Sequence, residues 1–281
     1  MDLDHLLTSL VYLSACMAVF ILGHASFLLL RRDYNIQYEL VEQDNPALAL
    51  TISGFYLGLV VAVGGVVTGP SLGLGEDLID FCIYGPLAIL LLHVSAWVND
   101  TFILTRFKIR EEILEDQNCG TGAVEFAVYV ASGMNIYGAV YGIGGSIFTT
   151  LGFWALGQMT LVGFGLFYPR MVGYDVHDQI EKDNVAVGVA FAGAIIAVGN
   201  LLRAASAEDF HSWGENTALF AGYVVVGLLL LPAARKLTDR VLLPGQDLSE
   251  ELVGQERPNL GAAFLEAGSY IGSSFLVTSC L

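Results

Sequence analysis

Two stretches of this 281-residue chain carry the same four polar residues at the same spacing. In each, an asparagine is followed by a glutamate seven residues later, then by a tyrosine four residues on and a serine three residues further. The residues are Asn118, Glu125, Tyr129 and Ser132 in the first stretch, and Asn259, Glu266, Tyr270 and Ser273 in the second. On a helix of about 3.6 residues per turn these offsets lie along one stripe. Each stretch therefore predicts an apolar helix with one polar seam.

Glu125 and Glu266 are the residues of the seam that could do chemistry. Each lies about 10 Å along its helix, inside a hydrocarbon core about 30 Å thick, where an ionisable side chain is costly. One hypothesis is that the two carboxyls meet near a pseudo-axis and bind or relay a cation or proton, because paired carboxyls in a low dielectric favour holding a proton. The other is that each carboxyl is neutral or hydrogen-bonded, for example to its own tyrosine, and serves packing alone.

The tyrosines and serines of the seam fit either hypothesis. Tyr129 and Tyr270 could donate to the carboxyls or offer an aromatic face to a cation. Ser132 and Ser273 continue the seam deeper, as a water-lined path requires, although serine is also common at close helix contacts.

Asp100 and Asp239 lie 139 residues apart, toward the ends of two other apolar runs. They are candidates for a cytoplasmic mouth of the site. Arg235, Lys236 and Arg240 surround Asp239 and predict a local ion pair in the second half of the chain.

The motifs of metal, cofactor and enzyme sites are missing from the sequence. The four cysteines are scattered without a CxxC pair, and His24 and His93 stand alone without metal-ligand spacing. No phosphate-binding loop occurs, and Ser132 and Ser273 have no histidine at helical spacing. We therefore expect no metal, no cofactor and no enzymatic activity.

The composition is that of a membrane protein. Hydrophobic residues make up 55% of the chain, charged residues only 14%, and the mean hydropathy is +0.64. Several apolar runs reach about 18 residues or more, which is the length of a membrane span. A net charge of −16 argues against nucleic acid as a partner and against a polybasic lipid-binding patch. The acidic N-terminus and the length of the first run predict a retained span rather than a cleaved signal peptide.

Eight spans are predicted, at about 6–30, 46–67, 78–104, 118–141, 147–167, 184–202, 217–231 and 259–281, with the seventh helix continuing toward Leu243. Of the 12 basic residues, all except Arg203 fall in linkers that follow odd-numbered spans. Because basic residues concentrate on the cytoplasmic side of a membrane, both termini should face outward and the long linkers should face the cytoplasm.

A duplication organises the eight spans. Asn45 and Asn184 are 139 residues apart, and Asn118 and Asn259 are 141 apart. We therefore expect an all-α polytopic membrane protein built from two four-helix repeats, residues 1–142 and 143–281. Because four spans is an even number, the repeats should be parallel and related by an axis along the membrane normal.

Asparagines open spans two, four, six and eight, at Asn45, Asn118, Asn184 and Asn259. Asparagine is among the best helix N-caps, so capping is the simplest role for all four residues. A direct role in binding is the alternative.

The linker-plus-helix patterns Glu42-Gln-Asp-Asn-Pro-Ala-Leu-Ala-Leu and Glu181-Lys-Asp-Asn-Val-Ala-Val-Gly-Val resemble the start of the second helix in YjfL-like bacterial membrane proteins, which contain domain of unknown function 350. Leu243-Pro-Gly-Gln-Asp-Leu-Ser-Glu-Glu-Leu and Leu265-Glu-Ala-Gly-Ser-Tyr-Ile are similar to the later half of that family. The resemblance covers nearly the whole chain as two tandem copies. It implies a small helical bundle in the bacterial inner membrane and brings no established activity.

Two functional hypotheses remain open at this stage. In the first, the glutamate seam lines a central site through which a cation or proton is bound or conducted. In the second, the protein is a non-transporting scaffold or accessory subunit whose acidic cytoplasmic linkers, at Glu111-Glu112 and Glu250-Glu251, recruit a soluble partner. The ion, the partner and the oligomeric state do not follow from the sequence.

Overall fold

The computed structural model describes residues 3–104, 106 and 108–281. In this part of the chain, eight helices are long and apolar enough to cross a membrane. They are α1 (Leu3–Leu30), α3 (Pro46–Thr68), α4 (Leu74–Phe102), α6 (Cys119–Val140), α7 (Ile147–Val172), α9 (Val185–Ser206), α10 (Trp213–Leu237) and α11 (Leu260–Cys280). The predicted all-α, eight-span architecture is confirmed. The helix of α10 also continues, as a π-helical turn, through η1 (Thr238–Leu242).

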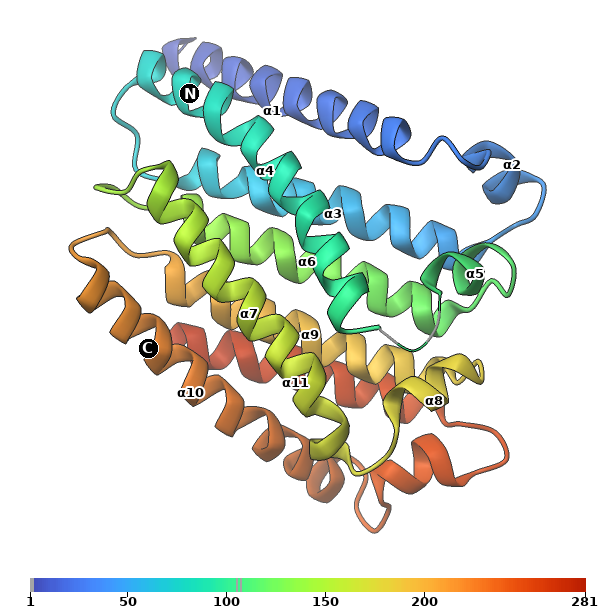
Figure 1. Ribbon diagram of the computed structural model, residues 1–281. Coiled ribbons are helices and arrows are strands. Elements are labelled where there is room, and N and C mark those ends of the chain that lie inside the picture. The colour runs from blue at the N-terminus through green and yellow to red at the C-terminus, as the bar shows by residue number, and fades with distance from the viewer. Residues whose placement is uncertain (1–2, 105, 107) are drawn as a thin grey trace.

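Four short helical segments lie together at one end of the molecule (Figure 1). They are α2 (Ile36–Val41), α5 (Ile109–Leu114), α8 (Val176–Glu181) and the π-helical turn η2 (Glu250–Gly254). Both termini and the remaining loops lie at the opposite end. The linkers that contain the short segments also contain most of the basic residues, so the positive-inside rule assigns this end to the cytoplasm. That orientation stays a prediction.

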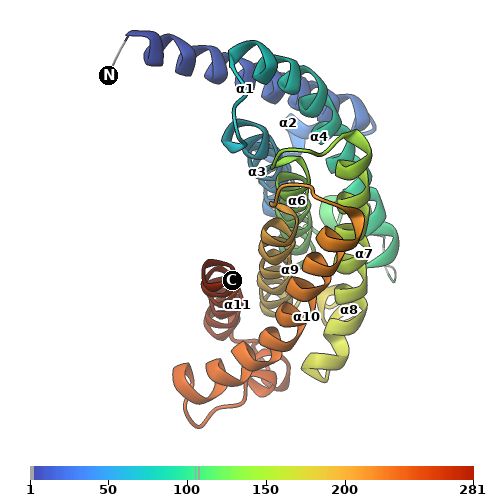
Figure 2. The ribbon, with the colours of Figure 1, turned by 90° about the vertical axis from the view of Figure 1, so that its left-hand side faces the viewer.

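The membrane-spanning helices are arranged around one row. Helices α3, α6, α9 and α11 follow one another, each packed against the next, so that α9 lies between α6 and α11 (Figure 2). Helices α4, α7 and α10 lie along one side of this row, and α1 lies beside α3 and α4. The row bends in the view along the helices. The two repeats thus stand side by side.

Glycine allows the helices of the row to approach backbone to backbone. A Cβ atom added to Gly133 would lie 2.2 Å from the carbonyl oxygen of Gly58 on α3. One added to Gly188 on α9 would lie 2.5 Å from the Cα atom of Gly120 on α6. Such distances leave no space for any side chain. The row therefore depends on small residues at its contacts, as is common where helices associate within lipid.

The asparagines Asn45, Asn118, Asn184 and Asn259 stand at the start of each helix in the row. Their Oδ1 atoms accept hydrogen bonds from the backbone N–H groups of Leu48, Gly120, Val187 and Ala262, at 2.8–3.2 Å. This is the geometry of an N-cap. The residues before the first three asparagines, Asp44, Gln117 and Asp183, have φ values of 51°, 51° and 59°, which turn the chain sharply into each helix.

The amide nitrogens of three of these asparagines link each helix of the row to the next. The Nδ2 atoms of Asn45, Asn118 and Asn184 donate to the carbonyl oxygens of Ile113, Ile180 and Leu252, at 2.8, 2.6 and 2.9 Å. Each acceptor lies in the short helical segment that precedes the following helix of the row. We call this series of bonds the asparagine ladder. Asn259 is at the end of the row, and its Nδ2 donates instead to Glu251 Oε2 in its own linker, at 2.8 Å.

Glu112 is a buried acid within the asparagine ladder. One of its carboxylate oxygens, Oε2, accepts a hydrogen bond from Asn118 Nδ2 at 2.8 Å, while the residue remains only 7% exposed. Burial raises the pKa of Glu112 above its usual range, and the nearby acids Asp116 and Asp183 add to the effect, against the lowering by Asn118. Ionised Glu112 is therefore less stable in the folded protein than in the unfolded chain.

Replacing Gly133 by alanine should destabilise the protein by about 1–3 kcal/mol, because the new Cβ must displace the backbone of α3. Gly163 on α7 is the matched control, because a Cβ there meets no atom within 4 Å among the described residues. Gly163→Ala should leave stability unchanged or raise it slightly, since alanine favours helix. Unfolding in detergent micelles measures both changes. Equal effects would contradict the close approach of α3 and α6.

Glu112→Gln should stabilise the protein in a pH-dependent way. A raised folded-state pKa means that wild-type stability is lost as pH rises from the unfolded pKa of about 4 through the folded value. Glutamine keeps an oxygen that accepts from Asn118 and carries no charge. The difference in unfolding temperature between variant and wild type should therefore grow as the pH rises above about 4. A difference in unfolding temperature that stays constant with pH would show that burial of the Glu112 carboxylate does not affect the stability of the protein.

Candidate functional site

Glu125 and Glu266 occupy two separate sites. Glu125 lies on α6 and Glu266 on α11, and α9 packs between these helices. Each carboxyl group has a different arginine near it. The prediction that the two carboxyls meet in one site near a pseudo-axis is therefore wrong. The physical reason is that the row of close backbone contacts places the repeats side by side instead of face to face.

The first site is a cavity of about 310 Å³ toward the end of the molecule that holds the short helical segments. Its polar lining includes Arg31, His93, Asp100, Glu125 and Tyr129, and we call it the Glu125 cavity. Arg31 follows the last residue of α1 and donates from Nη2 to the hydroxyl of Tyr129 at 3.0 Å. The predicted seam residues Glu125 and Tyr129 thus face open space together with Asp100.

Several oxygen atoms of the Glu125 cavity have no hydrogen-bond partner among the described residues. Glu125 Oε1, Asp100 Oδ1 and the hydroxyl of Tyr34 are buried and unpaired. A buried carboxyl oxygen without a donor is costly, so these atoms require a proton, a water molecule or a cation beside them. The arrangement is chemically suited to binding a proton or a small cation.

A cluster of polar side chains, all buried except the half-buried Trp154, lies between α4, α6 and α7. It consists of Ser95, Asn99, Ser132, Asn135, Trp154 and Gln158, and we call it the interhelix polar cluster. Gln158 bridges the helices: its Oε1 accepts from Asn99 Nδ2 and its Nε2 donates to Ser132 Oγ, both at 3.3 Å. Ser132 is thereby placed in a polar network, as the seam hypothesis requires.

Two further bonds and two unpaired oxygens complete the interhelix polar cluster. Trp154 Nε1 donates to Ser95 Oγ at 2.9 Å, and Asn135 Nδ2 donates to the carbonyl oxygen of Trp154 at 2.9 Å. The side-chain oxygens of Asn99 and Asn135 are buried and accept no hydrogen bond from the described residues. Both are acceptors, as in the Glu125 cavity.

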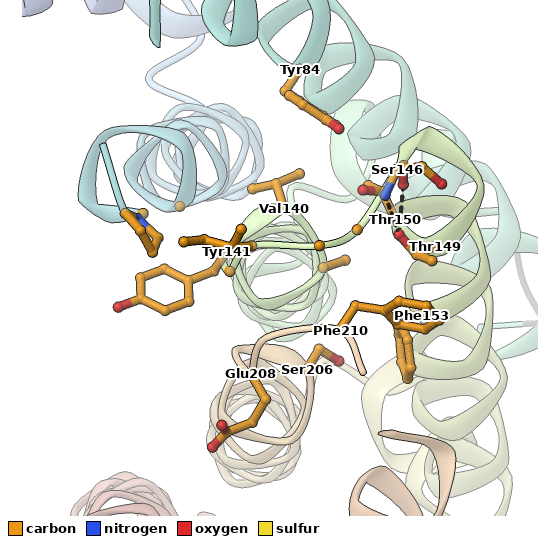
Figure 3. A pocket seen from close by; sticks show the side chains of 18 of the residues that line it. Tyr84, Val140, Tyr141, Ser146, Thr149, Thr150, Phe153, Ser206, Glu208 and Phe210 are labelled. Atoms are coloured by element: carbon orange, nitrogen blue, oxygen red, sulfur yellow. Dashed lines mark hydrogen bonds between the residues drawn. The ribbon is translucent and has the colours of Figure 1, made fainter. Parts of the chain in front are cut away.

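A second cavity, of about 240 Å³, lies toward the opposite end of the bundle. Figure 3 shows it close up, with the side chains of Tyr84, Thr149, Thr150, Ser206 and Glu208 around it. We call it the loop-end cavity, because the loop after α6 also lines it.

The interhelix polar cluster lies between the two cavities. Along α6, Glu125 belongs to the first cavity, Ser132 and Asn135 to the cluster, and Ala139 to the loop-end cavity. Asn135 and Ala139 are one helical turn apart, about 6 Å. Polar groups thus occur at intervals along α6, at its contacts with α4 and α7, from one cavity toward the other.

The second site is an ion pair and a set of hydrogen bonds at one oxygen of Glu266, whose other oxygen, Oε2, is buried and accepts no hydrogen bond from the described residues. Its Oε1 forms an ion pair with Arg235 Nη1 on α10 and accepts a hydrogen bond from the Tyr270 hydroxyl at 2.8 Å. Arg235 Nη2 donates in addition to Ser249 Oγ at 3.0 Å. Glu266 is fully buried and Arg235 is 8% exposed. Here the hydrogen bond to the tyrosine four residues on is present, together with a charge partner.

The arginines of the two sites come from different positions in the repeat. Arg31 at the end of α1 corresponds to Arg170 on α7, 139 residues later, but Arg170 is exposed and donates to the carbonyl oxygen of Leu166. Arg235 corresponds to Ala96, which lines the Glu125 cavity. The first repeat has alanine at this position, which leaves space beside Glu125. In the second repeat the guanidinium of Arg235 fills the corresponding space beside Glu266.

Asp239 and Ser273, the other residues predicted for the second repeat, make different contacts from their counterparts in the first repeat. Asp239 accepts a hydrogen bond from the backbone N–H of Leu248 at 3.0 Å. The ion pair predicted for it is not found in the described residues, because Arg235 turns to Glu266 instead. Ser273 is half-buried on α11 and joins no bridge comparable to that of Ser132 in the described part of the chain.

Several residues of the first site were not predicted. From the sequence we expected Arg31 only to contribute to linker charge, and we predicted no role for Asn99, Asn135 or Gln158. A detectable signal existed for these three, because uncharged amides within apolar spans must find partners inside the bundle. Which spans they join depends on helix order in the row, and the sequence does not contain that directly.

In each acidic linker pair proposed as a docking patch, one of the two glutamates is hydrogen-bonded within the protein. Glu112 and Glu251 accept hydrogen bonds from Asn118 and Asn259, both at 2.8 Å. Glu111 and Glu250 are exposed.

Comparison with known proteins identifies the family. The family model described as Domain of Unknown Function (DUF350) matches residues 1–140 and again residues 142–281. The chain therefore belongs to this family and contains two copies of its domain. It is also similar to a "UPF0719 transmembrane protein" of Aquifex aeolicus (strain VF5), with 22% identity over 255 residues that cover 89% of this chain and 91% of that protein. No solved structure matches the chain.

Neutralising the two glutamates should have unequal effects on stability. Glu266→Gln leaves Arg235 buried without its counter-charge, which costs about 3–5 kcal/mol. Glu125→Gln breaks no ion pair of the described residues and conserves volume, so its cost should stay within about 1.5 kcal/mol. The free energy of unfolding in detergent micelles gives both values.

The double substitution Glu266→Gln with Arg235→Gln is the control, because removing both charges should recover part of the stability lost in Glu266→Gln. Equal destabilisation by Glu125→Gln and Glu266→Gln would contradict the difference between the two sites.

Proposed function

We propose that the first repeat of this family member binds a proton or small cation at Glu125 and Asp100 and passes it across the bilayer to the loop-end cavity. The observation that supports this most strongly is the series of buried polar groups between α4, α6 and α7. Polar groups inside a membrane are costly in free energy, and in membrane proteins they mark ion pathways and binding sites.

The chemistry of the unpaired groups favours a positive occupant. Glu125, Asp100, Asn99 and Asn135 each present a buried oxygen that accepts no hydrogen bond from the described residues. Oxygen acceptors of this kind complete their bonding with a proton, with water or with a cation, and not with an anion. The two carboxyls can hold a proton directly, and the amide and hydroxyl groups beyond them can bind the water through which it moves.

Arg31 sets the electrostatics of the entry. Its guanidinium is held by the hydroxyl of Tyr129 in the same cavity as the two carboxyls. Arg110 and Asp33, which also line the cavity, pair with each other at 3.1 Å. Arg31 then balances only one of the two remaining carboxyls, so binding of one proton or monovalent cation makes the group neutral. A neutral group is the state that a low-dielectric environment favours.

The second repeat has a structural role in this proposal. Glu266 already has a positive partner in Arg235 and a hydrogen-bond donor in Tyr270. No added cation is needed to balance its charge.

The proposal extends to location and direction. The chain is a multi-pass membrane protein, and we place it in a bacterial inner membrane with both termini outside. The Glu125 cavity then faces the cytoplasm and the loop-end cavity faces outward.

Flux into proteoliposomes tests the function. A pH-sensitive dye in the lumen reports proton entry, and parallel vesicles with imposed potassium or sodium gradients report the other cations. Glu125→Gln should reduce the flux at least tenfold, because it removes the titratable group. Gln158→Leu should also reduce it, because leucine breaks the bridge between Asn99 and Ser132.

Thr160→Val on α7 is the matched control, since the Thr160 hydroxyl donates only to the carbonyl oxygen of Leu156 in its own helix. Its flux should equal that of the wild type. The proposal fails if wild-type vesicles pass none of these ions, or if Glu125→Gln conducts like the wild type.

A further inference from the structure

The row of helices ends at α11 with an uncovered face. Within the chain, the same face of the corresponding helix α6 packs against α9. On α6 the residues are Gly120, Val124, Ala127 and Ala131, all buried; on α11 the corresponding residues are Gly261, Leu265, Gly268 and Gly272, all exposed. Leu265 is 43% exposed, whereas its counterpart Val124 is inaccessible.

The other end of the row, at α3, has the complementary uncovered face. Helix α9 uses Gly188, Ala192, Ile196 and Gly199 on the side toward α6, and these are buried or half-buried. The corresponding residues of α3 are Ala49, Ser53, Leu57 and Val60, and all four are exposed. Neither uncovered face contains a charged residue. The chain thus carries both halves of an interface that it forms once internally.

We propose that α11 of one copy packs against α3 of a second copy in the way that α6 packs against α9. The residue sizes support this pairing. Internally, Gly199 faces Ala131, with a Cβ on Gly199 only 2.5 Å from the Ala131 Cα. At the corresponding point between copies, Val60 would face Gly272. The larger residue on α3 is matched by the smaller residue on α11.

The asparagine ladder continues across the same junction. The backbone N–H of each helix-opening asparagine donates to a carbonyl oxygen in its own linker. The next residue in that linker is the one whose carbonyl accepts the ladder bond from the asparagine of the preceding helix in the row. Ile113 follows Glu112, Ile180 follows Gln179, and Leu252 follows Glu251. The N–H of Asn45 donates to the carbonyl of Glu39 at 3.1 Å, so the corresponding ladder acceptor is the carbonyl of Leu40.

No preceding helix of the described chain supplies an asparagine to Leu40, and no following segment supplies a carbonyl to Asn259. The amide of Asn259 in one copy and the carbonyl of Leu40 in the next complete the ladder. Two independent features, the helix faces and the ladder, therefore select the same pair of ends.

The resulting contact is head-to-tail, because the faces of α3 and α11 differ. Interfaces of this type close into rings when the rotation between copies allows it. The bend of the row in Figure 2 gives successive copies such a rotation. The occupant of the uncovered α11 face is thus a second copy of this chain.

Disulfide cross-linking in membranes tests the junction. In a background where Cys16, Cys82, Cys119 and Cys280 are alanine, a chain with Val60→Cys is co-expressed with a chain with Gly272→Cys. Oxidation should give a disulfide-linked product of two chains and nothing larger, because each chain has a single cysteine. A chain with both substitutions should give products of three chains and more.

Three results would overturn the proposal. One is a cross-link between two Val60→Cys chains, which would show a two-fold contact. Another is cross-linking of Val60→Cys to Gly222→Cys on the exposed face of α10 with equal yield, which would show random collision. The third is a single photobleaching step per fluorescent spot for the labelled wild type in bilayers, which would show one copy per assembly.

A pair of bulky substitutions gives a second readout. Gly272→Leu should reduce the number of copies per assembly, while Gly222→Leu, a change of the same size in open space, should leave it unchanged. Both variants should keep the wild-type helix content, since a Cβ added at either glycine would meet no atom of another described segment within 4 Å. Unchanged assembly in Gly272→Leu would contradict the α11–α3 contact.

Discussion

Backbone contact between the helices of the central row is the constraint on which the rest of the structure depends. Lipid chains are as apolar as leucine, so helices in a membrane associate through packing and hydrogen bonds instead of through escape from water. At Gly58 and Gly133, and at Gly120 and Gly188, the packing is so close that no side chain fits between the helices. Polar side chains of α6 that remain in the membrane must therefore emerge to the side, between α4 and α7. That is where Ser132 contacts Gln158.

The duplication gave both repeats the same glutamate and then different surroundings. In the second repeat, Arg235 enters from α10 and completes a closed ion pair with Glu266. In the first repeat the corresponding residue is Ala96, and the arginine comes from the end of α1 and binds Tyr129 instead. A single change of side-chain size and charge thus separates a carboxyl that has a charge partner from one that has a cavity beside it, while each carboxyl keeps one unpaired oxygen among the described residues.

Much of the fold was predictable because its signals are local. The eight spans follow from apolar runs, and the asparagines that open α3, α6, α9 and α11 follow from cap chemistry and the repeat spacing. The pairing of the two glutamates was not predictable, since it depends on whether repeats stand face to face or side by side. That choice is made by contacts such as Gly188 with Gly120, between residues whose individual roles no spacing reveals.

Gln158 and Trp154 belong to the second repeat, yet the groups they bind, Ser95, Asn99 and Ser132, belong to the first. On α1, the positions 139 residues earlier are Val19 and Ala15, which cannot donate or accept such bonds. The polar assembly therefore exists only across the fusion point of the duplicated gene. A shorter ancestor with one domain would have had to take the missing groups from a neighbouring subunit, and in the joined chain the polar side chains of α1 bind elsewhere, His24 to Tyr56 and Ser26 to His93.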